Sequence, residues 1–110
     1  FDWQFLAANG YVVFGPNPFN PDEGVGRFNY LLSQDATIHI SIYSISGEEL
    51  WHTRLDSGVL NGGSIGFNQV NWDGRSKTGQ RVANGPYVGY LMADFNGKKT
   101  IKKIKIMVLK

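Results

Sequence analysis

The sequence predicts an all-β domain, an immunoglobulin-like antiparallel β-sandwich of about seven strands. Short segments of alternating apolar and polar residues are separated by turn-forming residues, roughly every eight to twelve positions. No window keeps helical periodicity, and 14 glycines with 14% aromatic residues suit short strands and tight turns. A chain of 110 residues fits one domain. We expect residues 1–10 to be a lead-in or the end of a preceding domain, and residues 11–110 to form the sandwich.

The first half of the expected sandwich contains three strands and a proline-rich segment. Residues 11–14 form a short first strand. The prolines of segment 16–21 hold the chain extended because proline cannot donate to a sheet ladder. Strict alternation over 28–32 and over 37–42 then predicts two half-buried strands, the second being the clearest in the chain.

The second half supplies four more strands. Residues 49–55 run back after a Ser-Gly turn, and residues 67–72 follow a glycine-rich loop. Residues 86–95 and 99–109 flank Asn96-Gly97, the strongest short hairpin signal, because a type I′ turn needs positive φ at both central residues. We therefore expect the chain to end in a long hairpin.

The hairpin turn also predicts the register of the last strand. If Asn96-Gly97 sets it, Phe95 pairs with Lys98, and three residues of the last strand face inward: Ile104, Ile106 and Val108. Ile101 has the wrong parity for that set. We therefore predict a β-bulge near Lys102-Lys103.

The charge distribution is uneven although the formal net charge is only +2. Six lysines fall within residues 98–110: Lys98, Lys99, Lys102, Lys103, Lys105 and Lys110. A nucleic-acid surface is one interpretation. We favour lysines that protect an edge strand from pairing with another sheet, and we expect no nucleic-acid partner. No apolar run approaches the roughly 20 residues that span a membrane.

Residues capable of catalysis or metal binding are sparse. The absence of cysteine excludes disulfides and thiolate metal sites. His39 and His52 lie on neighbouring expected strands, but two imidazoles are too few for a zinc site. Segment 74–78 lacks the glycine and the helix of a phosphate-binding loop. We expect no catalytic, cofactor or metal site, and therefore no enzyme.

Several aromatic residues have structural interpretations beside functional ones. Trp72 suits the core better than a sugar platform, and Asp73 suits a turn better than a calcium site. Tyr87 begins a late strand, where its hydroxyl ties a corner in many Greek-key sandwiches. Three aromatics are better candidates for an exposed carbohydrate-binding face or docking patch: Trp51, Tyr43 and Tyr90.

The order of several short motifs resembles a known family. They are Asn17-Pro18-Phe19-Asn20-Pro21, Phe28-x-Tyr30-x-Leu32, Ile42-Tyr43-x-x-Ser46-Gly47, Trp72-Asp73-Gly74-Arg75 with Gly79, Gly85-x-Tyr87, and Met107-Val108-Leu109-Lys110. Over about residues 11–110 the chain resembles the C-terminal sorting domains of the type IX (Por) secretion system. It is also similar to the immunoglobulin-like domain of the flagellar hook-capping protein.

The resemblance implies a non-catalytic domain without cofactors, carried by exported hydrolases or adhesins. Its implied partners are the outer-membrane export machinery and the preceding domains of the same chain. The implied location is secreted or on the cell surface, reached through the periplasm. The residues that match the signal segments are Pro16, Asn17, Pro18, Phe19, Ser46, Gly47, Lys105, Met107, Val108, Leu109 and Lys110.

Two other hypotheses remain open beside sorting. One is a carbohydrate-binding or other accessory module of a multidomain hydrolase, and the other is a structural domain of the hook-cap type. For sorting, we expect the terminal strand to offer free backbone groups that a partner recognises by strand addition.

Overall fold

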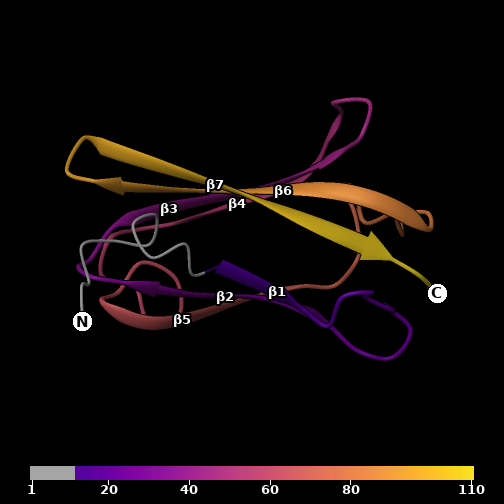
Figure 1. Ribbon diagram of the computed structural model, residues 1–110, viewed down its shortest axis with the longest axis horizontal. Coiled ribbons are helices and arrows are strands. Elements are labelled where there is room, and N and C mark those ends of the chain that lie inside the picture. The colour runs from indigo at the N-terminus through magenta and orange to yellow at the C-terminus, as the bar shows by residue number, and fades with distance from the viewer. Residues whose placement is uncertain (1–11) are drawn as a thin grey trace.

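The computed structural model describes residues 12–110, so the expected lead-in at 1–10 and Tyr11 lie outside the described residues. The described chain forms seven antiparallel strands in two layers (Figure 1). One sheet has the order β1-β2-β5: Val12–Gly15, Gly26–Leu32 and Gly66–Trp72. The other has the order β4-β3-β6-β7: Glu49–Leu55, Thr37–Ser44, Gly85–Phe95 and Lys98–Val108. The predicted immunoglobulin-like β-sandwich is confirmed.

The core lies between the sheets and is filled by alternate residues of the strands. The apolar positions of β2 and β3 that sequence alternation marked as inward are fully buried: Phe28, Tyr30, Leu32, Ile38, Ile40 and Ile42. Trp72 is only 1% exposed, and its indole N–H donates to the Arg75 carbonyl at 2.9 Å. The predicted core position of Trp72 is confirmed.

The described residues contain no helix long and apolar enough to cross a membrane.

The turn after Trp72 and the corner before β6 also have the expected structure. The Asp73 carboxylate accepts a hydrogen bond from the Arg75 N–H at 3.0 Å, as a turn-forming aspartate does. Gly74 has φ +81°, and a Cβ there would lie 2.7 Å from Pro21 Cβ. The Tyr87 hydroxyl donates to the Ala83 carbonyl at 2.6 Å, and burial raises its pKa. The corner tyrosine is therefore confirmed.

The β6–β7 hairpin has the predicted register but not the predicted bulge. Asn96 and Gly97 both have positive φ, Phe95 pairs with Lys98, and the pairing continues without a shift to Gly85 and Val108. The expected bulge near Lys102-Lys103 is wrong. Ile101 is 62% exposed because it faces outward, so its parity needs no correction.

A bulge occurs instead in the β3–β4 pair. Ile42 pairs with Trp51 and Tyr43 with Glu49, which leaves Leu50 as an extra residue. The Leu50 carbonyl accepts a hydrogen bond from the Lys77 N–H at 2.7 Å. Because a bulge bends its strand, the β3–β4 turn rises away from the sheet, as the magenta hairpin in Figure 1 shows.

The long loop before β5 is fixed by a buried polar cluster. The Tyr30 hydroxyl donates to the Gly62 carbonyl at 2.7 Å, and the Gly62 N–H donates to the Asn68 side chain at 2.8 Å. The Asn68 amide in turn donates to the Ser64 carbonyl at 2.8 Å. Asn68 is fully buried, and its role was not predicted. Burial raises the pKa of Tyr30.

Candidate functional site

The proline-rich segment lies along the end of the last strand. Phe19 forms a parallel bridge with Val108. The Phe19 N–H donates to the Met107 carbonyl at 2.7 Å, and the Leu109 N–H donates to the Phe19 carbonyl at 2.9 Å. We call this arrangement, Asn17–Phe19 paired with Lys105–Leu109, the C-terminal clasp.

The side chain of Asn17 extends this pairing where the backbone cannot. Its amide N–H donates to the Lys105 carbonyl at 2.9 Å, and its carbonyl oxygen accepts from the Met107 N–H at 3.0 Å. Prolines stand on both sides of Asn17 and have no N–H to offer. The asparagine amide therefore supplies a donor and an acceptor at the strand edge, as a backbone peptide group would.

Phe19 anchors the clasp in the core. Its side chain is fully buried, with ring centroids 5.7 Å from Phe14 and 5.8 Å from Trp72. Val108 is also fully buried. These two residues were predicted to take part in recognition, but their side chains are inaccessible in the folded domain. Met107 and Leu109 remain accessible, with 40% and 55% of their surface exposed.

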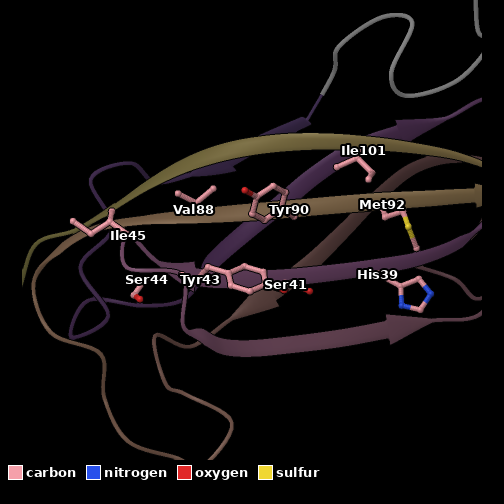
Figure 2. Close-up of a pocket in the computed structure, with 10 residues that line it drawn as sticks. His39, Ser41, Tyr43, Ser44, Ile45, Val88, Tyr90, Met92 and Ile101 are labelled. Carbon is pink, nitrogen blue, oxygen red and sulfur yellow. The ribbon is translucent and has the colours of Figure 1, made fainter.

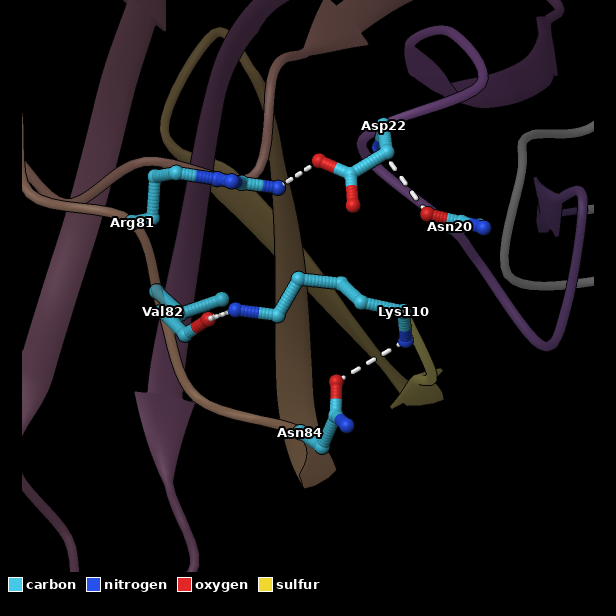
Figure 3. Close-up of polar contacts among 6 residues, drawn as sticks. All are labelled: Asn20, Asp22, Arg81, Val82, Asn84 and Lys110. Atoms are coloured by element: carbon cyan, nitrogen blue, oxygen red, sulfur yellow. Dashed lines mark hydrogen bonds and ion pairs between the residues drawn. The ribbon is translucent and has the colours of Figure 1, made fainter.

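Lys110 is held by the loop that precedes β6. Its ammonium donates to the Val82 carbonyl at 2.9 Å, and its backbone N–H donates to the Asn84 side chain at 2.8 Å (Figure 3). Beside it, Arg81 forms an ion pair with Asp22 (Figure 3). The end of β7 is thus fixed from the proline-rich segment and from the loop before β6.

The clasp changes the expected mode of edge recognition. We expected free backbone groups along the terminal strand. The clasp already uses the carbonyl of Lys105, both backbone groups of Met107 and the N–H of Leu109. The expectation of strand addition is therefore wrong for this half of β7. β7 is nevertheless an edge strand of its sheet, as predicted from its lysines.

Ser46 and Gly47 lie apart from the clasp. They form the β3–β4 turn, in which the Gly47 N–H donates to the Ser44 carbonyl at 3.0 Å and Gly47 has φ +96°. Strand register places this turn at the same end of the sheet as Ile106. Among the described residues, no hydrogen bond joins this turn to the clasp, so the predicted signal residues do not form one patch.

The three predicted exposed aromatics do not share a face. Tyr43 and Tyr90 meet edge to face with ring centroids 5.5 Å apart on the outer surface. Trp51 pairs with the buried Ile42 and packs against Trp72 at 6.3 Å, so it lies on the core side. The grouping of Trp51 with the tyrosines is wrong, because alternation along β4 places it inward.

Titratable groups beside Tyr43 form local pairs. The Tyr43 hydroxyl donates to the Glu49 carboxylate at 3.2 Å, and this hydrogen bond raises the pKa of Tyr43. His52 lies opposite Ser41, with its Nδ1 3.6 Å from Glu49. His39 is on the adjacent strand, as expected. In residues 12–110 no group of three or more His, Cys, Asp or Glu side chains could hold a metal ion.

No protein-family profile and no curated protein sequence matches the chain. Solved structures are similar in fold. PorU from Porphyromonas gingivalis is 22% identical with a TM-score of 0.67, over 89% of this chain and 9% of PorU. FlgD from P. aeruginosa is 14% identical with a TM-score of 0.64, over 86% of this chain and 70% of FlgD.

PorZ, a surface component of the type IX secretion system of the same P. gingivalis, is 22% identical with a TM-score of 0.53. The match covers 92% of this chain and 12% of PorZ. The chain therefore spans only a small part of the length of the two Por proteins. At these identities the similarity establishes the fold.

Proposed function

We propose that this chain is a non-catalytic sorting or accessory domain of a secreted or cell-surface bacterial protein. In this proposal the outer-membrane export machinery recognises it after it enters the periplasm. The observation that carries the proposal is the C-terminal clasp. Two segments that match the sorting pattern, one near each end of the described chain, are joined there into one structural unit.

The fold neighbours support this proposal. PorZ is a surface component of a type IX secretion system, and PorU and PorZ each contain a domain of this shape within a much longer chain. A domain that accompanies larger exported proteins fits a carrier or accessory role. The preceding domains of the same chain are then its permanent partners.

The surface offered for recognition follows from the burial within the clasp. Phe19 and Val108 maintain the fold, whereas the exposed groups are Pro16, Pro18, Lys105, Met107 and Leu109. Apolar side chains beside a lysine form a small amphipathic strip. The machinery would contact side chains of this strip, since the backbone groups beneath are already bonded.

A reporter fusion tests the sorting role. Residues 1–110 are fused to a periplasm-directed reporter in a bacterium that has a type IX secretion system. We expect the reporter to reach the surface or the medium. The double variant Lys105→Glu with Leu109→Glu changes only exposed side chains and should lower export, whereas Arg27→Glu on the other sheet should not.

Two results would contradict the sorting role. One is a wild-type fusion that stays in the periplasm. The other is normal export of the folded double variant. Circular dichroism and thermal unfolding of the purified variants show whether the fold is intact, so that loss of export is not confused with unfolding.

The alternative of an accessory module in a hydrolase has one structural parallel. A β-glucuronidase from Parabacteroides merdae contains a similar domain, with a TM-score of 0.52 at 10% identity over 13% of that chain. A glycan platform is disfavoured because Trp51 faces the core and the rings of Tyr43 and Tyr90 are perpendicular. Pull-down on insoluble polysaccharides, with Tyr90→Ala as the comparison, tests it.

The hook-cap alternative predicts self-assembly. The similarity to FlgD supports the shared fold. Sedimentation of the purified chain over a range of concentrations distinguishes a ring or cap from a monomer. A strict monomer contradicts this alternative and leaves the sorting proposal intact.

A further inference from the structure

A shallow apolar groove crosses the outer face of the four-stranded sheet. Its volume is about 710 Å³, and its principal apolar side chains are Tyr43, Ile45, Val88, Tyr90, Met92 and Ile101. Figure 2 shows these side chains on one face, contributed by β3, β6, β7 and the β3–β4 turn. The raised turn places Ile45 beside Val88 at one end of the groove (Figure 2).

The outer face of a sandwich sheet is ordinarily polar at these alternate positions. Here Ile45 is 73% exposed, and Ile101 is exposed at the other end of the groove. Contiguous exposed apolar side chains on a folded domain mark interaction surfaces. The groove is therefore a candidate for contact with another molecule.

One border of the groove carries unneutralised positive charge. Strand register places Lys103 opposite Tyr90 and Lys105 opposite Val88, on the same face as the groove. The Lys103 ammonium lies 5.9 Å from the Tyr90 ring centroid. Neither lysine forms an ion pair with any carboxylate in residues 12–110.

The opposite border carries no unpaired lysine or arginine among the described residues. On β4, Arg54 forms an ion pair with Asp56 at 2.8 Å, and His52 lies beside Glu49. The groove thus has an apolar floor, one cationic border and an opposite border without an unpaired cation. This asymmetry specifies both the composition and the orientation of a ligand.

We propose that the groove binds an acidic amphipathic segment of a partner protein. Apolar side chains of the segment would cover Tyr90 and Ile101, and carboxylates along one border would pair with Lys103 and Lys105. Lys105 also belongs to the strip proposed for sorting, whereas Lys103 and the groove floor do not. Peptide binding is measured on the purified domain and does not depend on export, so failure of one role is distinguishable from failure of the other.

Other occupants fit the groove less well. The same face of a second copy offers few carboxylates for Lys103 and Lys105, because Glu49 and Asp94 there already accept hydrogen bonds from Tyr43 and Gly97. An anionic lipid surface fits less well because the Glu49 carboxylate on the β4 side of the groove would face its headgroups. A glycan prefers aromatic faces to the perpendicular Tyr43–Tyr90 pair.

The test uses the ¹⁵N-labelled chain and two synthetic helical peptides. Both peptides carry leucines on one face, and along one border they carry either glutamates or lysines. We expect amide shifts at Tyr43, Tyr90 and Ile101 on addition of the glutamate peptide. The lysine peptide should bind about tenfold more weakly, as expected for the loss of close charge pairing.

A charge swap makes the test specific. The double variant Lys103→Glu with Lys105→Glu should bind the glutamate peptide about tenfold more weakly and the lysine peptide more tightly than wild type. Added salt should reduce both differences in affinity. Arg27→Glu, a charge reversal on the other sheet, is the matched control and should change neither affinity.

Several outcomes overturn the proposal. They are no binding of either peptide, equal binding of both, or shifts confined to another face. Shifts at the groove that appear only with phospholipid micelles or with oligosaccharides would assign it to a lipid surface or a glycan. Groove shifts that grow with protein concentration alone would assign it to a second copy of the chain.

Discussion

Replacing Asn17 by alanine tests whether the clasp contributes to the fold. The change removes two hydrogen bonds, one to the Lys105 carbonyl and one from the Met107 N–H. A hydrogen bond contributes about 0.5–1.5 kcal/mol net, and water can replace these bonds in part because Asn17 is exposed. We therefore expect the free energy of unfolding to fall by about 1–2 kcal/mol.

This loss is too small to unfold the domain, because single domains are stable by about 5–15 kcal/mol. Urea unfolding followed by tryptophan fluorescence measures the global change. Native-state hydrogen exchange measures the local one, and the Met107 amide should exchange faster because its acceptor is gone. Asn17→Asp keeps the acceptor for the Met107 N–H but places a carboxylate oxygen against the Lys105 carbonyl. It should therefore lower the unfolding free energy by at least as much as Asn17→Ala.

Asn71→Ala is the matched control. Asn71 is an exposed residue of β5, and its side chain bonds no other described residue. Its replacement should change the unfolding free energy by less than about 0.5 kcal/mol. If Asn17→Ala behaves like this control and the Met107 amide keeps its protection, the asparagine does not hold the last strand.

Three further predictions concern the core and the buried polar cluster. Phe19→Ala should lower the unfolding free energy by about 3–5 kcal/mol in denaturant titrations, because it empties a fully buried site; a loss no larger than that of the exposed Phe67→Ala would contradict it. Asn68→Ala should lower the unfolding free energy by about 1–3 kcal/mol, because the buried Gly62 N–H loses its acceptor. A free energy of urea unfolding within about 0.5 kcal/mol of wild type would refute this. Burial raises the pKa of Tyr30, so its stabilising effect is complete below the unfolded pKa of about 10 and is lost as pH rises above it. Between about pH 9 and pH 11.5 the unfolding free energy should therefore decline less steeply with pH for Tyr30→Phe than for wild type. Equal slopes for the two proteins would count against this.

The strands and the final register were predictable because they depend on local patterns. Alternation over 37–42 and the Asn96-Gly97 turn each need only a few neighbouring residues. The same alternation marks Trp51, Thr53 and Leu55 as one face of β4 and His52 as the other. That signal was present and would have placed Trp51 on the core side.

Other features depend on contacts that no local pattern encodes. Ile101 is apolar but faces outward. From the sequence alone, an outward isoleucine cannot be told from an inward one whose parity has been shifted by a bulge. The bonds of Asn17 join residues 88 and 90 positions apart. Asn68 is a polar residue in an alternating strand, and only the fold shows that the loop 61–64 closes over it.

The clasp also determines when the domain can finish folding. A chain made from its N-terminus produces Phe19 long before Val108, the residue that it must bridge. Until then Phe19, one of the largest core side chains, lacks its neighbour, and both loop closure and burial wait until β7 has been made. A chain interrupted before Val108 would keep Phe19 exposed and its core incomplete. A compact domain therefore indicates that all seven described strands have been made.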